Sequence, residues 1–564
     1  MLQQQNDKIK AARRETVLCS YDAARAENNQ RFLEGDKKAT SEYIYPNQKA
    51  DAAGIVNEYY FNQRRVVSIT KKTKVGADGL MIEVAKLMTT HPDDNFVTNP
   101  TNVRILTGMS NALWEKDMKE KAPGCFKGKI FHHGQLKKAD LREMRDSLLI
   151  IDELDTGDKE RQVLHNTLQE SGVLDVNYMR QNNIRFMFIS ATMIKELYEL
   201  YRWGELHCLY AMSIPSTYIS HYDFLARGII QEFYPITTAE AASRWLQEDI
   251  LDNYGPEDCR IHIIRANLKT SGIIQTECFK KGIVAHNHTS DDKIEEQELR
   301  ELFECPILTQ HHVLIVKGFF RRANLIPNDW KLRVGATHEL YTKKVDNNVQ
   351  IQGLPGRMTG YWRDVINNGH KTGPYRTSVM AIEQYEAAYN DPFGKNSYQA
   401  AGFKKNDGKV TTMVPTLVAV KNISGMTEVI DLPDASDHKC VRHPKLFDTI
   451  DEVKTFLKGK RKDMKVETVN VTDGAFHQRE GYWLTSRLPG NRVENLRKED
   501  RLTLVKANKI AASTCISSES GNKYLILPVY ETEETPADSV KFQVRYIKFK
   551  PVVNLEEEEA KLES

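Results

Sequence analysis

Two adjacent carboxylates follow a run of apolar residues in the first half of the chain. Residues 148–151 are all Leu or Ile, typical of a buried strand, and Asp152 and Glu153 come directly after them. In an open α/β sheet, ligands bind at the edge formed by the carboxyl ends of parallel strands. Nucleotide hydrolysis needs such a pair, one carboxylate to hold Mg²⁺ through water and the next to polarise the attacking water. A strand that ends in a solvated turn is the alternative.

Two short motifs downstream bear on the same chemistry. The apolar run at residues 186–189 ends in the Ser-Ala-Thr triplet 190–192, and a Gly-Arg pair stands at 356–357. An arginine there can present its guanidinium to a γ-phosphate across a domain cleft, as an arginine finger does. Each motif alone means little, but their order in two successive α/β units is much more specific.

The surrounding pattern predicts two α/β domains in tandem. Apolar, β-branched runs alternate with amphipathic stretches over residues 42–215, and the same rhythm restarts after Pro235. Near-continuous apolar strands separated by helices indicate a parallel sheet covered on both faces. The expected strands and helices lie at residues 66–69, 103–106, 148–151, 186–189, 261–264 and 313–316, and at 80–88 and 239–249.

The ends of the chain have a different texture. Residues 1–41 are polar and helix-prone, which predicts a helical accessory arm, and residues 396–409 are polar and contain glycine, which is typical of a linker. Residues 551–564 form an acidic tail that we expect to be disordered. Between linker and tail, a separate α+β accessory domain over 396–550 is predicted from expected strands at 416–420, 524–529 and 540–548 and a helix at 449–457.

Composition limits the class of protein. With 79 Lys and Arg against 77 Asp and Glu, the net charge is +2, so a basic binding surface must be a local groove. A hydrophobic content of 40% excludes a wholly disordered chain. No apolar run is long enough for a membrane span, and the charged start lacks a secretory signal, so an intracellular protein is expected. Eight scattered cysteines without a CxxC pair fit a reducing compartment.

The ordered motifs resemble those of superfamily 2 helicases, most closely the helicase-like proteins of large DNA viruses and phages. The resemblance covers residues 42–395. It implies RecA-like domains at 42–215 and 216–395, and an ATP-dependent translocase or helicase with ATP and Mg²⁺ in the cleft. In these terms the Walker B motif is Asp152 (Mg²⁺ through water) and Glu153 (water positioning), motif III is Ser190, Ala191 and Thr192, and motif VI holds Gln352, Gly356 and the finger Arg357.

The phosphate loop departs from the family pattern AxTGxGKT. Ala77 stands where the lysine belongs and Asp78 where the Mg²⁺-binding threonine belongs. A carboxylate aimed at a triphosphate is repulsive at low dielectric. Either the chain is a dead or severely weakened NTPase that kept the fold for binding, or Lys71, Lys72 or Lys74 restores the charge while Asp78 reaches Mg²⁺, or the true loop lies elsewhere. The nucleotide-binding set that the resemblance implies, with Gln48 reading adenine, is Gln48, Lys71, Lys72, Thr73, Lys74, Gly76, Ala77, Asp78 and Gly79.

The resemblance also implies a single-stranded DNA or RNA track, with replication, transcription or packaging partners. Motif Ia supplies Thr107, Gly108 and Ser110, and motif V supplies Arg321 and Arg322. In motif VI, Gly360 stands where many relatives have a second arginine, which leaves Arg357 as the lone finger. The rival hypothesis is a two-lobed clamp that binds nucleic acid or a partner without ATP turnover.

Overall fold

The computed structural model falls into two compact units, Met1–Met426 and Thr427–Ser564. Arg321, Arg322 and the acidic tail at residues 551–564 lie outside the part of the chain that the structure describes. The described residues are 2–36, 38–142, 144–289, 292–318, 320, 326–426, 440–442, 446–459, 502–503, 524–530 and 541–547.

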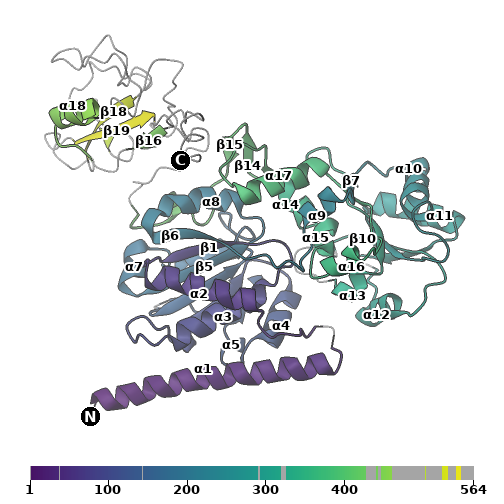
Figure 1. Ribbon diagram of the computed structural model, residues 1–564, viewed down its shortest axis with the longest axis horizontal. Coiled ribbons are helices and arrows are strands. Elements are labelled where there is room, and N and C mark those ends of the chain that lie inside the picture. The colour runs from purple at the N-terminus through teal and green to yellow at the C-terminus, as the bar shows by residue number, and fades with distance from the viewer. Residues whose placement is uncertain are drawn as a thin grey trace, which may run out of the picture. The chain divides into compact units, whose positions relative to one another are not determined.

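The first lobe (residues 46–211) is built on a six-stranded, all-parallel sheet (Figure 1). Its strand order is β3-β2-β4-β5-β1-β6. Alternate residues of its central strands enter two separate hydrophobic cores, one with α2 and α3 and the other with α6 and α7, which explains their continuous apolar sequences. The elements are α2 (Pro46–Tyr60), β1 (Val66–Thr70), α3 (Ala77–Thr90), β2 (Val103–Thr107), α4 (Ala112–Lys121), α5 (Gly124–Lys127), β3 (Ile130–Phe131), β4 (Ser147–Asp152), α6 (Val163–Glu170), α7 (Val176–Gln181), β5 (Ile184–Ser190), α8 (Ile194–Leu200) and β6 (His207–Ala211).

The second lobe (residues 221–390) repeats this architecture with strand order β7-β12-β11-β8-β10-β9, again all parallel. One face of β8 and β10 packs on α10 and α11. The elements are α9 (His221–Ala226), β7 (Ile230–Glu232), α10 (Ala239–Trp245), β8 (Ile261–Arg265), α11 (Leu268–Lys280), β9 (Val284–His288), α12 (Glu296–Glu304), β10 (His312–Val316), α13 (Asn328–Lys331), β11 (Val334–His338), α14 (Asn347–Ile351), α15 (Leu354–Met358), α16 (Arg363–Asn367), β12 (Tyr375–Thr377) and α17 (Val379–Asn390).

The two sheets confirm the predicted fold class, two tandem RecA-like α/β domains. All six predicted strands of this region are present, and the helix predicted at 80–88 lies inside α3. The helix predicted at 239–249 is α10 followed by a π-helical turn, Leu246–Leu251. The domain boundaries themselves stay predictions.

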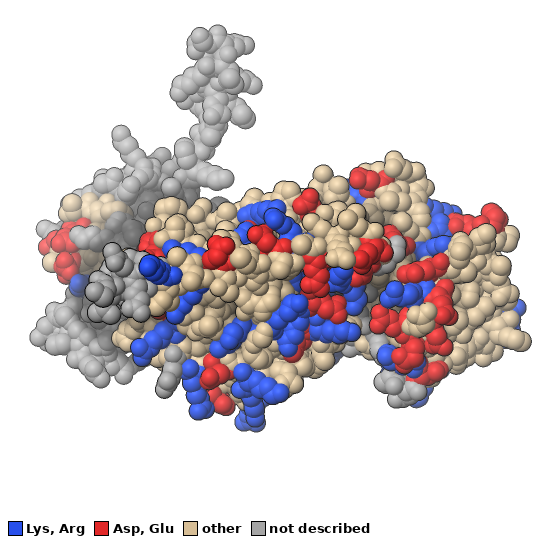
Figure 2. Space-filling model, turned by 90° about the horizontal axis from the view of Figure 1, so that it is seen from below, with Lys and Arg blue, Asp and Glu red and all other residues tan. Residues whose placement is uncertain are grey.

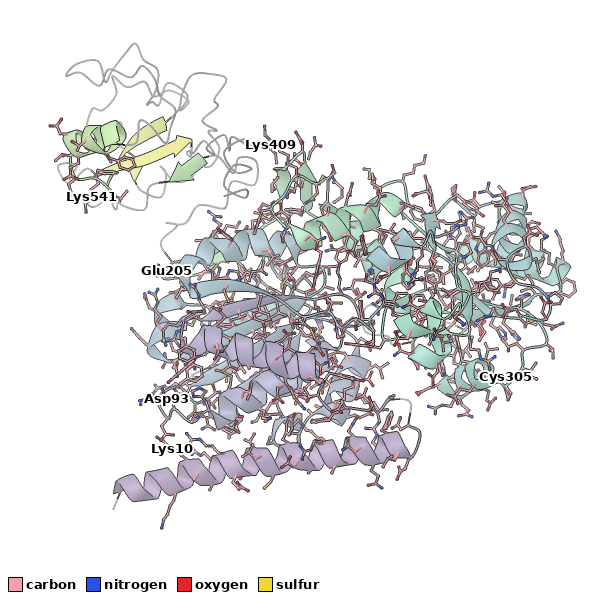
Figure 3. All side chains as sticks on the ribbon, in the orientation of Figure 1. Lys10, Asp93, Glu205, Cys305, Lys409 and Lys541 are labelled. Carbon is pink, nitrogen blue, oxygen red and sulfur yellow. The ribbon has the colours of Figure 1, made fainter. Side chains whose placement is uncertain are left out.

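The polar N-terminal segment forms one long helix, α1 (Leu2–Leu33), which runs along the underside of the first lobe in Figure 1. Val17 and Tyr21 are its buried contacts, and the Tyr21 hydroxyl donates to Glu83 at 2.7 Å. Lys10 pairs with Asp94 at 3.2 Å, next to the Asp93 labelled in Figure 3. A few apolar contacts and surface ion pairs therefore hold an otherwise solvated helix.

Two predictions for the region after the second lobe are wrong. Residues 396–409 are not a linker but part of a small antiparallel sheet of β13 (Gln399–Ala400), β14 (Phe403–Asn406) and β15 (Lys409–Met413). Asp407 and Gly408, both at positive φ, make its hairpin turn, and Asp-Gly is a strong hairpin signal.

Residues 416–420 do not form a strand. They make a turn that leads into the short helical turn Val420–Asn422. Their apolar side chains are buried in the same core as Trp203, whose indole N–H donates to the Val418 carbonyl at 2.9 Å. Burial without regular structure produces the same apolar run as a core strand, which is why the pattern misled.

In the second unit, the predicted strands at 524–529 and 540–548 correspond to β18 and β19, and the predicted helix at 449–457 corresponds to α18. The sheet order is β16-β19-β18-β17. The bounds are β16 (Cys440–Arg442), α18 (Ile450–Gly459), β17 (Leu502–Thr503), β18 (Tyr524–Tyr530) and β19 (Lys541–Ile547). An accessory α+β domain over 396–550 stays a prediction.

The surface agrees with the balanced charge of the chain. Figure 2 shows basic and acidic side chains interspersed over the face seen from below, without a continuous field of one sign. Among the described residues, no helix combines the length and the apolar character that crossing a membrane requires.

Gly108 provides a test of how tightly the sheet edge is packed. A Cβ at this position would lie 1.9 Å from the Thr156 carbonyl oxygen, so the loops after β2 and β4 would have to separate. We expect Gly108→Ala to lower the free energy of unfolding by about 1–3 kcal/mol in a urea titration.

Gly272→Ala is the matched control, because nothing lies within 4 Å of its added Cβ in α11. It should be neutral or stabilise by roughly 0.5–1 kcal/mol, since alanine is the better helix former. Equal unfolding midpoints for the two variants would contradict this description of the loops.

Candidate functional site

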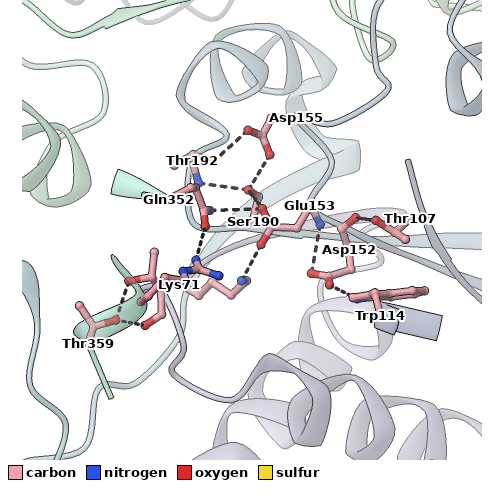
Figure 4. Close-up of polar contacts among 12 residues, drawn as sticks. Lys71, Thr107, Trp114, Asp152, Glu153, Asp155, Ser190, Thr192, Gln352 and Thr359 are labelled. Atoms are coloured by element: carbon pink, nitrogen blue, oxygen red, sulfur yellow. Dashed lines mark hydrogen bonds and ion pairs between the residues drawn. The ribbon is translucent and has the colours of Figure 1, made fainter. Parts of the chain in front are cut away.

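The carboxylate pair lies at the carboxyl edge of the first sheet, as predicted (Figure 4). Asp152 is the last residue of β4 and is 6% exposed. Its carboxylate accepts hydrogen bonds from the Trp114 indole at 2.8 Å and from the Glu153 amide at 3.0 Å. Burial raises the pKa of Asp152 to about 7, although the nearby Lys71 ammonium acts in the opposite direction. Asp152 is therefore poised to exchange a proton near neutral pH.

Lys71 faces this pair from the end of β1. Its ammonium donates to Glu153 Oε1 at 3.0 Å, and both side chains are buried. Burial alone would lower the pKa of Lys71, but attraction to Glu153 and then to Asp152 outweighs it and raises the pKa above its usual value. The sheet thus places a charged lysine at the acidic edge, although position 77 lacks one.

The Ser-Ala-Thr triplet is tied to the same edge. The hydroxyls of Ser190 and Thr192 donate to the two carboxylate oxygens of Asp155 at 2.8 and 2.9 Å. The Thr192 carbonyl accepts from the Asn348 side-chain amide of α14 at 3.2 Å. The Ser-Ala-Thr triplet therefore connects the carboxylate edge of the first lobe with the second lobe, and Ala191 is buried.

Gln352 and Arg357 reach the carboxylate edge from the second lobe. The Gln352 side-chain amide donates to Glu153 Oε2 at 3.4 Å, and the Arg357 guanidinium donates to Gln352 Oε1 at 3.1 Å. Arg357 is 1% exposed and lies on α15, directly after Gly356. A continuous chain of contacts therefore runs from Lys71 through Glu153 and Gln352 to Arg357. We call this chain the seam network.

Contacts within the second lobe fix α15. Its first amide, that of Leu354, donates to Glu339 Oε2 at 2.9 Å. The other oxygen of Glu339 accepts from Arg265 Nε at 2.5 Å. This buried pair links β8 and β11 to the helix that carries Arg357, which explains why a short helix can hold a guanidinium in one place.

Gln48 lies against the phosphate loop. Its amide donates to the Gly76 carbonyl at 2.6 Å, and its oxygen accepts from the Tyr45 amide at 2.9 Å. A Cβ at Gly79 would lie 2.4 Å from that oxygen, so the helix start must be small there. A cavity of about 90 Å³ opens beside these residues, lined also by α1 through Ala24, Glu27, Asn28 and Arg31.

The second lobe also holds the loop itself. The Thr359 hydroxyl donates to the Thr73 carbonyl at 3.0 Å, and the Tyr361 hydroxyl donates to the Val75 carbonyl at 2.6 Å. Lys72 donates to Glu386 Oε2 at 2.6 Å. The same ammonium lies 3.7 Å from the centre of the Tyr389 ring, a cation–π distance. The phosphate loop is therefore clamped by both lobes.

Asp78, the acid at the threonine position, is paired. It lies in the first turn of α3, and its carboxylate accepts from Lys121 at the end of α4 at 2.6 Å. Burial acts to raise the pKa of Asp78, but Lys121 prevails and the pKa is lowered. Lys121 thus removes much of the repulsion expected of this acid, while direct Mg²⁺ binding by Asp78 stays a prediction.

The predicted nucleic-acid-binding residues differ in their exposure to solvent. Thr107 is buried and donates to the Asp152 carbonyl at 2.9 Å, and Gly108 is buried against Thr156. Ser110 is exposed. Thr107 and Gly108 therefore hold the sheet edge, and contact with a nucleic-acid strand stays a prediction for this set.

Four residues at the site were not among the predicted site residues. Lys121, Tyr361, Glu386 and the buried Lys331, whose ammonium donates to the Thr359 carbonyl, all reach the loop or its contacts. Lys121, Glu386 and Lys331 lie in segments without a recognisable motif, whereas Tyr361 directly follows Gly360 at the end of the stretch with the Gly-Arg pair, where its own role had no signal.

The side chains present fit a magnesium nucleotide in chemical type. Asp152 and Glu153 supply carboxylate oxygens, and Lys71 and Arg357 supply cations in the same buried space. Within the described ranges, no group of three or more His, Cys, Asp or Glu side chains is arranged to hold a metal ion. Mg²⁺ usually takes one or two carboxylates and completes its shell with phosphate and water. Asp152 would hold it through water.

No protein-family profile and no curated protein matches the chain. Solved structures do. S. cerevisiae Dbp5 bound to RNA and ADP BeF3 is 11% identical, with a TM-score of 0.33 over 63% of this chain and 93% of that one. The DEAD-box helicase Mss116 bound to ssRNA and UDP-BeF is 14% identical, with a TM-score of 0.30 over 61% and 66%.

The Sulfolobus solfataricus SWI2/SNF2 ATPase core in complex with dsDNA is 10% identical, with a TM-score of 0.22 over 51% of this chain and 81% of that one. With TM-scores this low, the nucleic acids and nucleotides named for those structures are properties of those proteins and not of this chain. The three structures do not support the predicted similarity to viral or phage proteins.

The buried Lys71–Glu153 pair generates a stability prediction. Lys71→Met leaves a buried carboxylate without its cation and should cost about 3–5 kcal/mol of unfolding free energy. Adding Glu153→Gln removes the orphaned charge. The double variant should therefore lose at least about 1 kcal/mol less unfolding free energy than the two single variants lose together. Urea denaturation of the four proteins measures this coupling.

The exposed pair Arg244 and Glu248, 3.4 Å apart, serves as the control cycle. Its coupling should stay below about 0.5 kcal/mol because water screens it. A seam coupling as small as that of this pair would mean that Lys71 and Glu153 do not interact in solution.

Proposed function

We propose that this chain is an ATP-dependent translocase or helicase that acts on DNA or RNA through a rewired phosphate site. The observation that carries the proposal is the seam network, in which a buried carboxylate at the first sheet edge is joined by hydrogen bonds to a buried arginine of the second lobe. A packing contact alone does not require two cations, a carboxylate and an amide in series across a lobe boundary.

Each member of the network has a chemical role in this proposal. Glu153 orients and polarises the attacking water, and Arg357 stabilises charge that develops on the terminal phosphate. Lys71 replaces the lysine missing at position 77. Mg²⁺ bound to the nucleotide supplies further charge neutralisation, with Asp152 holding it through water.

The coupling role falls to the contacts that join nucleotide and lobes. Gln352 touches Glu153 directly, and Thr192 reaches Asn348 in the second lobe. A nucleotide that draws Glu153 or Lys71 to its phosphates changes these contacts and biases the lobe arrangement. Repeated closure on a bound strand would then move the protein along it.

The clamped loop favours a second candidate, a clamp without turnover. Lys72 and the Thr73 and Val75 carbonyls are already engaged by second-lobe side chains. If those contacts persist, a triphosphate competes with them for the loop. The chain would then bind nucleic acid or a partner in a fixed two-lobed form.

Hydrolysis separates the two candidates. We expect single-stranded nucleic acid to stimulate ATP hydrolysis by the wild-type chain. Glu153→Gln and Arg357→Ala should each lower the rate at least about 100-fold, the size expected for groups that act on water or on transition-state charge. Phosphate release at saturating ATP measures the rate.

Glu248→Gln, a carboxylate 52% exposed in the second lobe, is the control and should leave the rate unchanged. A wild-type rate no higher than that of Glu153→Gln, at equal protein and with nucleic acid present, would exclude the motor and leave the clamp.

Restoring the family residues tests whether the site is rewired. In Ala77→Lys with Asp78→Thr, a further ammonium enters a site already served by Lys71, and Lys121 loses its carboxylate partner. We expect ATP hydrolysis to fall at least about tenfold, because the new charge displaces a working arrangement. A gain in ATP affinity and rate would instead indicate a phosphate loop that had lost its function.

A further inference from the structure

Lys331 brings a further cation to the seam. It is the last residue of α13 and is 3% exposed. Its ammonium donates to the Thr359 carbonyl at 2.7 Å and to the Asn328 side chain at 3.0 Å. Thr359 in turn bonds Thr73 in the phosphate loop through its hydroxyl, at 2.8 Å. One residue therefore separates the Lys331 amine from the loop.

Gly360 makes room for this amine. A Cβ at position 360 would lie 2.6 Å from Lys331 Nζ and 2.9 Å from the Asn328 oxygen, and Gly360 has a φ of 149°. Any larger residue would collide with the lysine or bend the segment away. The Lys331 amine can therefore be buried at this place only because residue 360 has no side chain.

Several basic side chains lie close together at the seam. Lys74 is influenced by Arg357, Lys71 and Lys331 together, and Glu153 is the carboxylate that counteracts them. Burial and then Arg357 lower the pKa of Lys331 to about 7. Burial and then the same guanidinium hold the pKa of Lys74 well below its usual range. Amines whose pKa is lowered in this way hold their protons more readily when a multiply charged anion lies beside them.

We propose that Lys331 is a phosphate-binding cation of the second lobe, which acts with Arg357 on the terminal phosphate of a nucleoside triphosphate. The inference rests on the proposed function and names a residue that no motif contains. This role of Lys331 makes the site selective for a triphosphate over a diphosphate. The terminal phosphate of a triphosphate is attracted by both Lys331 and Arg357, and a diphosphate lacks that phosphate.

Binding of fluorescent ATP and ADP analogues tests the selectivity. We expect Lys331→Met to weaken ATP binding at least about tenfold and ADP binding less than twofold, since a charged contact contributes about 1.4 kcal/mol or more. Lys331→Arg keeps the charge and should stay within about threefold of wild type for both nucleotides.

Lys405→Met is the matched control. Lys405 is fully buried, donates to the Pro392 carbonyl at 3.1 Å and has a pKa that burial lowers to about 8, but it lies in the small sheet away from the seam. It should leave both affinities unchanged. Loss of ATP selectivity in Lys405→Met as well would mean that removing any buried lysine disturbs the site.

A pH series gives a second readout, taken as the difference between the wild type and Lys331→Arg, because Asp152, whose pKa burial raises to about 7, titrates over the same range in both proteins. The charged groups that face Lys331 are Arg357 and Lys74. The Lys331 amine is cationic below its pKa of about 7 and loses its proton as the pH rises. ATP affinity of the wild type should therefore fall from pH 6.5 to 8.5, and a bound phosphate moves that fall toward higher pH. Lys331→Arg, cationic throughout, should show a clearly smaller fall, because the slope from Lys331 is gone.

The outcomes separate the two levels of the proposal. If the wild type binds and hydrolyses ATP while Lys331→Met keeps its selectivity and Lys331→Arg keeps the pH slope, the role of Lys331 is wrong and the proposed function stands. If the wild type binds neither nucleotide at millimolar concentration, both are wrong. If Lys331→Met does not fold, the pH series with Lys331→Arg decides alone.

Discussion

The buried pair of Lys71 and Glu153 is the constraint on which the site depends. Two charges taken out of water are tolerated only when each finds its partner, so the ends of β1 and β4 cannot shift independently. The parallel sheet meets this requirement because both strands end at one edge, with β5 between them. Gln352 of the second lobe then donates to the second oxygen of Glu153, so the same pair also takes part in the contact between the lobes.

If the proposed function holds, other residues compensate for the departures in the phosphate loop and in motif VI. Asp78 gains Lys121 from α4, the missing lysine at 77 has its counterpart in Lys71, and the empty space at Gly360 holds the Lys331 ammonium. Loss of a function by drift would leave orphaned charges, which cost stability when buried. Compensation of each change by a residue of opposite or equal charge favours a site that is kept for an anion.

Sequence patterns predicted local features well and long-range ones poorly. Apolar runs located the strands that carry Asp152 and Ser190, because a strand buried on both faces has a distinctive composition. The Asp407–Gly408 hairpin had a signal that a polar composition obscured. The contact of Lys72 with Glu386 spans 314 residues and leaves no local trace, since any acidic residue on a helix looks the same before folding.

That long-range contact also bears on how the lobes are coupled. Lys72 is two residues from Lys74 and one from Lys71, so the backbone that positions the seam cations also positions the Glu386 partner. Movement of the loop toward a phosphate therefore strains or breaks the Lys72–Glu386 pair, and separation of the lobes pulls on the loop. Two sites linked through one short segment affect each other equally, as thermodynamic linkage requires. If a nucleotide binds as proposed, its occupancy and the lobe arrangement would be coupled through residues 71–74 without any relay through the sheets.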